Sequence, residues 1–214
     1  MRRAVLAGVL VCALADWGAS ARPAVVPPTV ERHCASIART RQVGVLCPRT
    51  LPAGRWIVNH ESLRVGRCQY LVDLETRPAG ASDPFHVLAG GRCGRFPLAV
   101  RRGRWPADVH LPRDLGLIGA KPLTPGGSPD VQHVRLRVLR RARVAGHAAL
   151  LLLAAPYPDG GVHGGHTVVV WNQHGDGYTL TMHFHASDRR GREARAATLL
   201  RAADAMSATP AAAL

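Results

Sequence analysis

The cysteines are the feature of this 214-residue chain that most constrains its fold. Whether they form disulfides depends on the compartment in which the protein folds. The chain has five cysteines, and Cys12 lies inside an apolar run, Ala4 to Ala15, that follows two arginines. A charged start, a short apolar run and small residues at 19–21 are typical of a secretory signal peptide and its cleavage site. We therefore expect residues 1–21, and Cys12 with them, to be removed on export.

Four cysteines then remain in the mature chain. An even number of cysteines in an exported protein predicts disulfides, because the compartments outside the cytoplasm do not keep thiols reduced. A zinc site would favour paired C-x-x-C spacings, and the sequence contains none. Four cysteines allow three pairings, of which the nearest-neighbour one is favoured: Cys34 with Cys47, and Cys68 with Cys93.

The composition predicts one globular domain. Apolar residues make up 47% of the chain, too many for a disordered polyelectrolyte, and the length is short for several large domains. We expect the domain to cover residues 31–208, after a disordered proline-rich leader at 22–30 and before a disordered tail at 209–214. No apolar run of the mature chain is long enough to cross a bilayer, so no transmembrane span is expected.

Short β-rich segments bounded by turn residues predict strands through most of the domain. They lie at 56–59, 68–74, 85–88, 96–101, 134–138, 148–155, 166–171 and 178–185. One helix is expected at 31–40, and residues 102–130 form a long connection. A last helix follows Ser187 or Asp188 as its cap, with an apolar stripe at helical spacing made of Ala196, Leu199, Leu200, Ala203 and Met206. This order predicts an α+β fold, an antiparallel β-sheet with a C-terminal helix packed on one face.

A group of histidines is the candidate for chemistry. If the last two strands pair symmetrically about their turn, the numbers of opposite residues add up to 349, which puts His166 opposite His183. Because side chains alternate along a strand, His166, His183 and His185 then share one face. Val169, Trp171, Tyr178, Leu180, Met182 and Phe184 share the other face, which is the core.

Three interpretations of these histidines stay open. Imidazoles suit zinc, copper or nickel, so the group predicts a metal-binding protein or a metal-dependent hydrolase. No carboxylate is placed nearby as a fourth ligand or base, which favours the simpler interpretation that the histidines are polar cover at strand ends. A pH sensor, in which clustered imidazoles repel one another on protonation, is the third and least favoured.

Basic residues dominate the charge, with a formal net charge of +14. Only Lys121 among the 28 basic residues is a lysine, and this bias resembles that of GC-rich coding sequences. Export argues against nucleic acid as a partner. Arginines at 135, 137, 140, 141 and 143 are instead placed to meet anionic envelope polymers or lipid headgroups, or they simply solvate a strand.

Three runs of the second half carry a resemblance: Val144–Leu150, Gly164–Trp171 and Gly175–Leu180, with Ala203 and Met206 in the helix that follows. They resemble small secreted proteins of unknown function from high-GC Gram-positive bacteria, the Actinobacteria. They are also similar to a bacterial extracytoplasmic domain of unknown function found on anti-sigma-factor-like and sporulation proteins. The resemblance implies two hairpins, a terminal helix and a place outside the cytoplasm.

These observations predict a secreted, non-catalytic binding or sensing domain that acts on an envelope protein or an anionic surface. We expect no catalytic residue and no cofactor. The alternative is a metal-binding protein or hydrolase that uses His166, His183 and His185.

Overall fold

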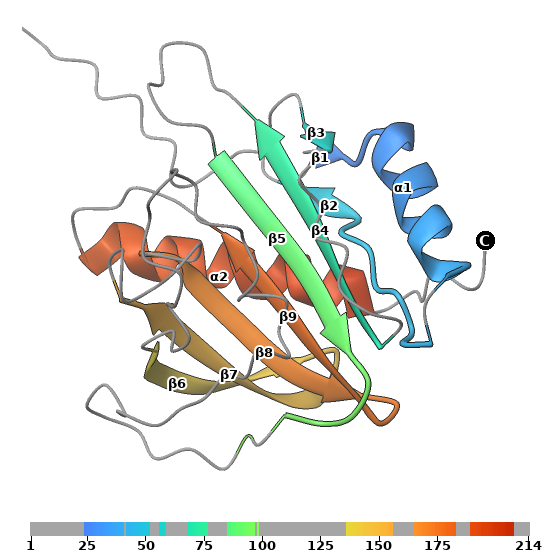
Figure 1. Cartoon of the computed structure of the whole chain (residues 1–214). Coiled ribbons are helices and arrows are strands. Elements are labelled where there is room, and N and C mark those ends of the chain that lie inside the picture. Colours follow the sequence, from blue (N-terminus) through green and yellow to red (C-terminus); the bar gives the residue numbers. More distant parts are fainter. Residues whose placement is uncertain are drawn as a thin grey trace, which may run out of the picture.

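The computed structural model of the chain describes residues 24–40, 42–51, 56–58, 68–76, 85–96, 98, 136–155, 165–182 and 189–207. Within these residues there are two helices, α1 (Pro28–Ala38) and α2 (Arg189–Ser207) (Figure 1). The strands are β1 (Ala24–Val25), β2 (Thr50–Leu51), β3 (Ile57–Val58), β4 (Gln69–Thr76), β5 (Phe85–Arg92), β6 (Leu136–Val144), β7 (His147–Ala154), β8 (Thr167–Gln173) and β9 (Asp176–Met182).

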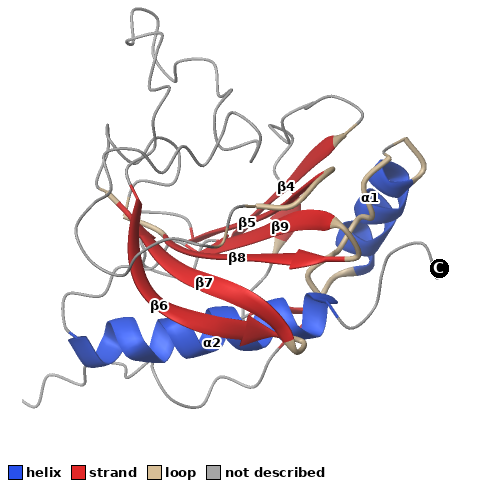
Figure 2. Ribbon diagram, turned by 90° about the horizontal axis from the view of Figure 1, so that it is seen from below, coloured by secondary structure: helices blue, strands red, loops and turns tan. Residues whose placement is uncertain are grey.

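Seven strands form one antiparallel sheet in the order β3-β4-β5-β9-β8-β7-β6, and β1 pairs with β2 separately. The C-terminal helix α2 runs across one face of this sheet (Figure 2). The predicted α+β class, with an antiparallel sheet and a C-terminal helix on one face, is confirmed.

Two tight hairpins set the register of the second half of the sheet. Ala145 and Gly146 join β6 to β7, and His174 and Gly175 join β8 to β9, all four with positive φ. Positive φ at both central residues is the geometry of two-residue turns that match the twist of paired strands. In the β8–β9 pair, Val169 lies opposite Leu180, so the predicted register is confirmed.

The larger core lies between the sheet and α2. Five of the predicted core-face residues, Val169, Trp171, Tyr178, Leu180 and Met182, are buried there, and Phe184 lies outside the described residues. Trp171 stacks on Tyr178 with 5.7 Å between ring centroids. The helix buries one stripe against them, which confirms the predicted apolar face, with Leu200 only partly buried at its margin. The apolar helix residues buried in this core are Ala196, Leu199, Ala202, Ala203 and Met206.

Hydrogen bonds fix the C-terminal end of α2 beside the two hairpin turns. The carboxylate of Asp204 accepts a hydrogen bond of 2.7 Å from the backbone N–H of Ala145. The side chain of Gln173 donates one of 3.0 Å to the carbonyl of Ser207. The helix therefore crosses the sheet in one defined direction.

The opposite face of the sheet is also buried. A second apolar cluster on it contains Phe96, Leu136, Val138, Leu150, Leu152, Ala154, Val168 and Val170. His166, Thr179 and Thr181 lie on this face and are at most 4% exposed. The polar cover that the sequence favoured for His166 would leave its side chain in water, so this interpretation is wrong for His166. Successive side chains of β8 and β9 therefore point to two faces of the sheet that are both buried, and the face with His166, Thr179 and Thr181 is the more polar one.

The leader predicted to be disordered at 22–30 is ordered from Ala24 onward. Ala24 and Val25 pair with β2, and α1 begins at Pro28 rather than at Glu31. Proline suits the first turn of a helix because its φ is already helical and its missing N–H would have no helical partner there. The prolines at 27 and 28 therefore mark the start of a helix and not a disordered leader.

The strand predicted at 96–101 is not formed at Phe96 or Leu98, the two residues of that range that the structure describes. The side-chain amide of Asn172 pairs with Phe96 instead, accepting from its N–H at 2.7 Å and donating to its carbonyl at 3.0 Å. Pro97 follows directly and has no N–H to give to a ladder. One side chain thus holds Phe96 over the second apolar cluster.

The segment after α1 is tied to the sheet by two side chains. The buried hydroxyl of Tyr70 accepts from the N–H of Leu46 at 2.9 Å and donates to its carbonyl at 3.0 Å. The carboxylate of Asp176 accepts from the N–H groups of Gly44 and Gly94 at 3.4 and 3.3 Å. These contacts join the segment after α1 to β4, to the residues that follow β5 and to the β8–β9 turn.

Two disulfides join Cys34 to Cys47 and Cys68 to Cys93, which is the nearest-neighbour pairing that the sequence favoured. The Cα atoms are 6.0 and 5.0 Å apart. The first bond ties α1 to the following loop. The second flanks the β4–β5 pair, where the N–H of Cys93 donates to the carbonyl of Cys68 at 2.8 Å. Such bonds favour an oxidising, extracytoplasmic compartment.

Several predictions lie outside the described residues and stay predictions. They are the signal peptide at 1–21, the connection at 102–130, the helix cap at Ser187 or Asp188, the tail at 209–214 and the positions of His183 and His185.

The two disulfides should differ in their resistance to reduction. Cys34 and Cys47 are 1% and 8% exposed, whereas Cys68 is exposed and Cys93 half-buried. Thiol–disulfide exchange requires access of the attacking thiolate to sulfur. With limiting reductant, alkylation and peptide mass analysis should find free Cys68 and Cys93 first. Release of Cys34 and Cys47 at the same time or earlier would contradict this order.

The Asn172 amide should contribute measurably to stability. Asn172→Asp keeps the shape and the acceptor but places a carboxylate oxygen against the carbonyl of Phe96. We expect the free energy of unfolding in urea to fall by about 1–3 kcal/mol. Gln42→Glu adds the same charge on an exposed loop and should leave it nearly unchanged. Equal effects of the two variants would refute the role of the amide.

Candidate functional site

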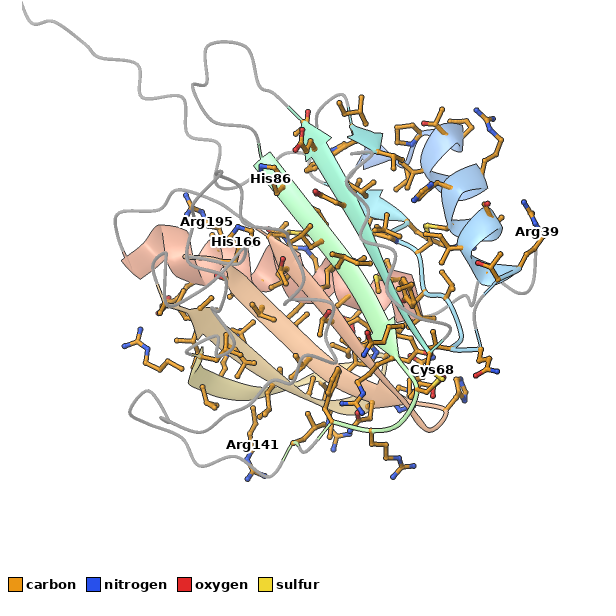
Figure 3. The ribbon with its side chains drawn as sticks, viewed as in Figure 1. Arg39, Cys68, His86, Arg141, His166 and Arg195 are labelled. Atoms are coloured by element: carbon orange, nitrogen blue, oxygen red, sulfur yellow. A yellow bond between two sulfur atoms is a disulfide. The ribbon has the colours of Figure 1, made fainter. Side chains whose placement is uncertain are left out.

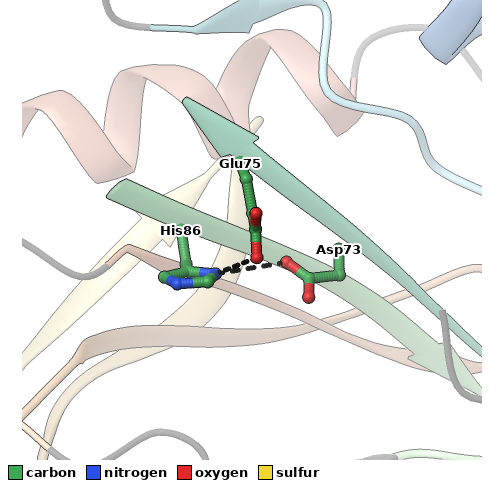
Figure 4. Close-up of side chains that lie close together, drawn as sticks. All are labelled: Asp73, Glu75 and His86. Carbon is green, nitrogen blue, oxygen red and sulfur yellow. Dashed lines mark ion pairs between the residues drawn. The ribbon is translucent and has the colours of Figure 1, made fainter. Parts of the chain in front are cut away.

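Three ligand-type side chains meet on the face of the sheet opposite α2, at one end of β4 and β5 (Figure 4). Asp73 and Glu75 are two residues apart on β4 and therefore point to the same side. On β5, His86 lies directly opposite Glu75, and Leu88 lies opposite Asp73. Strand alternation and register thus bring the two carboxylates and the imidazole together. This group is called the Asp73 cluster below.

The imidazole faces both carboxylates. His86 Nδ1 lies 3.6 Å from Asp73 Oδ1 and 3.4 Å from Glu75 Oε1. The side chains are 27%, 14% and 21% exposed for His86, Asp73 and Glu75 respectively, so each is mostly shielded and still reachable from solvent. Within the described part of the chain, this is the group of three His, Cys, Asp or Glu side chains whose ligand atoms lie within 4.8 Å of one another.

The carboxylates raise the pKa of His86 above its usual value. The short-range polar interaction with Asp73 is the largest cause, and the negative charges of Asp73 and Glu75 add to it. Partial burial of the ring opposes them, because it disfavours the charged imidazolium. In the absence of another cation, a proton on His86 therefore compensates part of the negative charge of the cluster.

The cluster can do two things chemically. With His86 protonated, it forms an ion pair that links β4 to β5. With His86 neutral, it presents one nitrogen and two carboxylates to a cation, a donor set that suits divalent transition metals.

Among the histidines predicted as ligands, the structure describes His166. Its ring is buried, 4% exposed, and its Nδ1 lies 3.3 Å from the hydroxyl of Thr181. His183 and His185 lie outside the described residues, so the predicted group of three remains a prediction. Figure 3 labels His86 and His166.

The predicted basic strand is the edge strand β6. Arg137, Arg140, Arg141 and Arg143 are exposed on it, and Arg135 lies outside the described residues. Arg140 lies opposite Leu151 and Arg141 opposite Leu150, so these two neighbours point to different faces. The pairing shifts by one residue between Val138 and Arg140, at a β-bulge.

Two tyrosines in the core have shifted pKa values and act structurally. Burial raises the pKa of Tyr70 far above its usual value, although its hydrogen bond to Leu46 lowers it. Burial and the charge of Asp176 raise the pKa of Tyr178 to about 12. Both phenols therefore stay neutral and serve packing and hydrogen bonding.

Sequence reasoning missed the Asp73 cluster, although a signal for it was present. The favoured Cys68–Cys93 bond implies a symmetric pairing in which the numbers of opposite residues add up to 161, and Glu75 and His86 fit that sum. The carboxylates and His86 are 11 to 13 residues apart in the sequence, so proximity along the chain does not indicate the group.

The comparisons with known proteins return no relatives. No protein-family model matches the chain. Searches of curated proteins and of solved structures also give no match.

The His86 ion pair should make stability depend on pH. Because its pKa is raised on folding, its stabilising contribution is fully present below the unfolded-state value of about 6.5 and is lost as the pH rises through the folded-state pKa. With chelator present, the free energy of unfolding of the wild type minus that of His86→Gln should be larger at pH 6 than at pH 8.5. Urea unfolding followed by circular dichroism measures this difference.

The matched control is His147→Gln, which removes an imidazole at the other end of the sheet, beside the hairpin turns. The free energy of unfolding of His147→Gln minus that of His86→Gln should also be larger at pH 6 than at pH 8.5. A difference that is flat with pH, or that increases toward pH 8.5, would contradict the ion pair.

Proposed function

We propose that the chain is a secreted, non-catalytic binding domain that attaches to phosphate-bearing anionic surfaces of the cell envelope through β6. The observation that carries the proposal is the group of four exposed arginines on this edge strand: Arg137, Arg140, Arg141 and Arg143. Arginine suits phosphate because its planar guanidinium presents several donors in a fixed fork.

The position of these arginines favours a surface ligand. β6 is the last strand of the sheet, so its outer edge is not covered by another strand of the sheet. The β-bulge and the alternation distribute the guanidinium groups on both sides of this edge. An extended anionic surface can therefore contact arginines from both faces at once, whereas a small ligand on one face cannot.

A purely protective role for the arginines is the competing explanation. Charged residues on edge strands prevent unwanted pairing with other chains, and bulges do the same. Positive and negative side chains would serve this protective role equally well. The charge on β6 is positive throughout, in a chain with a formal net charge of +14, and this favours attraction to anions.

The proposed location agrees with other features of the chain. Both disulfides lie within the N-terminal half of the chain. The first 21 residues have the pattern of a signal peptide. No helix among the described residues has the length and apolar character needed to cross a membrane.

Vesicle binding tests the proposal. The mature chain should bind vesicles that contain phosphatidylglycerol, should not bind neutral phosphatidylcholine vesicles, and should dissociate as salt is raised. Replacing the four β6 arginines with glutamine should weaken binding by more than about 30-fold, since each arginine near an anionic surface contributes about 1 kcal/mol. Co-sedimentation over a range of lipid concentrations gives the affinities.

The control removes the same charge elsewhere. Arg32, Arg39, Arg95 and Arg201 are also exposed, and Arg39 lies on the other side of the molecule from Arg141 (Figure 3). Their replacement with glutamine should reduce affinity much less. Equal losses in the two variants would show that overall charge, and not β6, carries binding. Equal binding to neutral vesicles, or capture of a specific envelope protein by the quadruple β6 variant as well as by the wild type, would refute the anionic-surface proposal.

A further inference from the structure

We propose that Asp73, Glu75 and His86 form a binding site for a divalent transition metal, with Zn²⁺ as the best-fitting ion. This inference is independent of the proposed function, because β6 and the β4–β5 pair lie at different places in the sheet.

The separations between the ligand atoms fit metal coordination. In a tetrahedral zinc site with metal–ligand distances of about 2.1 Å, neighbouring ligand atoms are about 3.4 Å apart. His86 Nδ1 is 3.4 Å from Glu75 Oε1 and 3.6 Å from Asp73 Oδ1. The two carboxylate oxygens lie within 4.8 Å of each other, so a cation can be held after side-chain rotations that bring them closer together.

The donor set selects the kind of ion. One imidazole and two carboxylates are nitrogen and oxygen ligands, which zinc and related ions accept, whereas calcium and magnesium prefer oxygen alone. Two ionised carboxylates also balance the charge of a divalent cation. Three protein ligands leave one tetrahedral position for water, as in open zinc sites.

The backbone holds these ligands in place before an ion arrives. Asp73 and Glu75 belong to a strand paired along its whole length with β5, so their positions relative to His86 are set by the register. The disulfide between Cys68 and Cys93 is in the same register and stops the two strands from sliding. A ligand set held in this way loses little conformational entropy on binding.

A second pair of imidazoles lies close together but offers fewer metal ligands than the Asp73 cluster. His147 and His174 lie beside the hairpin turns with ring centroids 6.2 Å apart. They do not belong to a group of three ligand atoms within 4.8 Å among the described residues. Two imidazoles without a third donor bind surface metal weakly, so this pair serves as an internal control.

The experiment uses the mature chain, free of any histidine tag and treated with chelator. Titration calorimetry with ZnCl₂ should find one ion bound per chain with proton release, and CaCl₂ or MgCl₂ should bind much more weakly. Glu75→Gln and His86→Gln should each weaken zinc binding by more than about 10-fold. His174→Asn, which removes a histidine and keeps a residue that tolerates positive φ, should bind zinc like the wild type.

A measurement on the wild type guards against variants that fold poorly. Co²⁺ added in place of Zn²⁺ should shift and broaden the NMR signals of the His86 ring before those of His147 and His174. Zinc binding that survives in Glu75→Gln and His86→Gln but is lost in the triple variant His166→Ala, His183→Ala and His185→Ala would overturn the proposal and assign the metal to the predicted histidine group. Absence of zinc binding at micromolar concentrations would overturn it as well.

Discussion

Helix α2 and the β8–β9 hairpin bury Leu199 and Met206 together with Trp171, Leu180 and Met182 in the larger core of the described residues, and the other elements depend on this contact. Full burial of a leucine such as Leu199 stabilises the fold by about 1.5–3 kcal/mol, and Trp171 adds a larger area. Because the other face of β8 and β9 is buried too, the hairpin has core contacts on both sides. Strands added at either side, β5 or β7, then pair with a template that is already rigid.

The parts of the fold that follow from local chemistry could be predicted from the sequence. The turn at His174 and Gly175 fixes the β8–β9 register, and the spacing of apolar residues fixes which stripe of α2 is buried. The expected export and the even number of cysteines predicted two disulfides, and pairing each cysteine with its nearest neighbour in sequence gave the observed bonds. In each case the deciding interaction joins residues that are close in sequence, so one sequence contains enough information.

The parts that were missed depend on partners far away in the chain. Phe96 looked like the start of a strand, but its backbone is paired by Asn172, a side chain on β8. His166 was predicted to be exposed because the residues next to it in the sequence do not indicate the apolar cluster that lies on its face of the sheet. Asp73 and Glu75 meet His86 only once β4 and β5 are paired, which requires the register to be known. Pattern alone cannot supply these long-range contacts.

The Cys68–Cys93 bond links the geometry of the Asp73 cluster to the redox state of the surroundings. A slip of β5 by one residue would turn the ring of His86 to the opposite side of the sheet, away from both carboxylates. A covalent link at the end of the pair forbids that slip. In a reducing environment the chain lacks this restraint, and the register that places His86 beside Asp73 and Glu75 then depends on strand pairing alone.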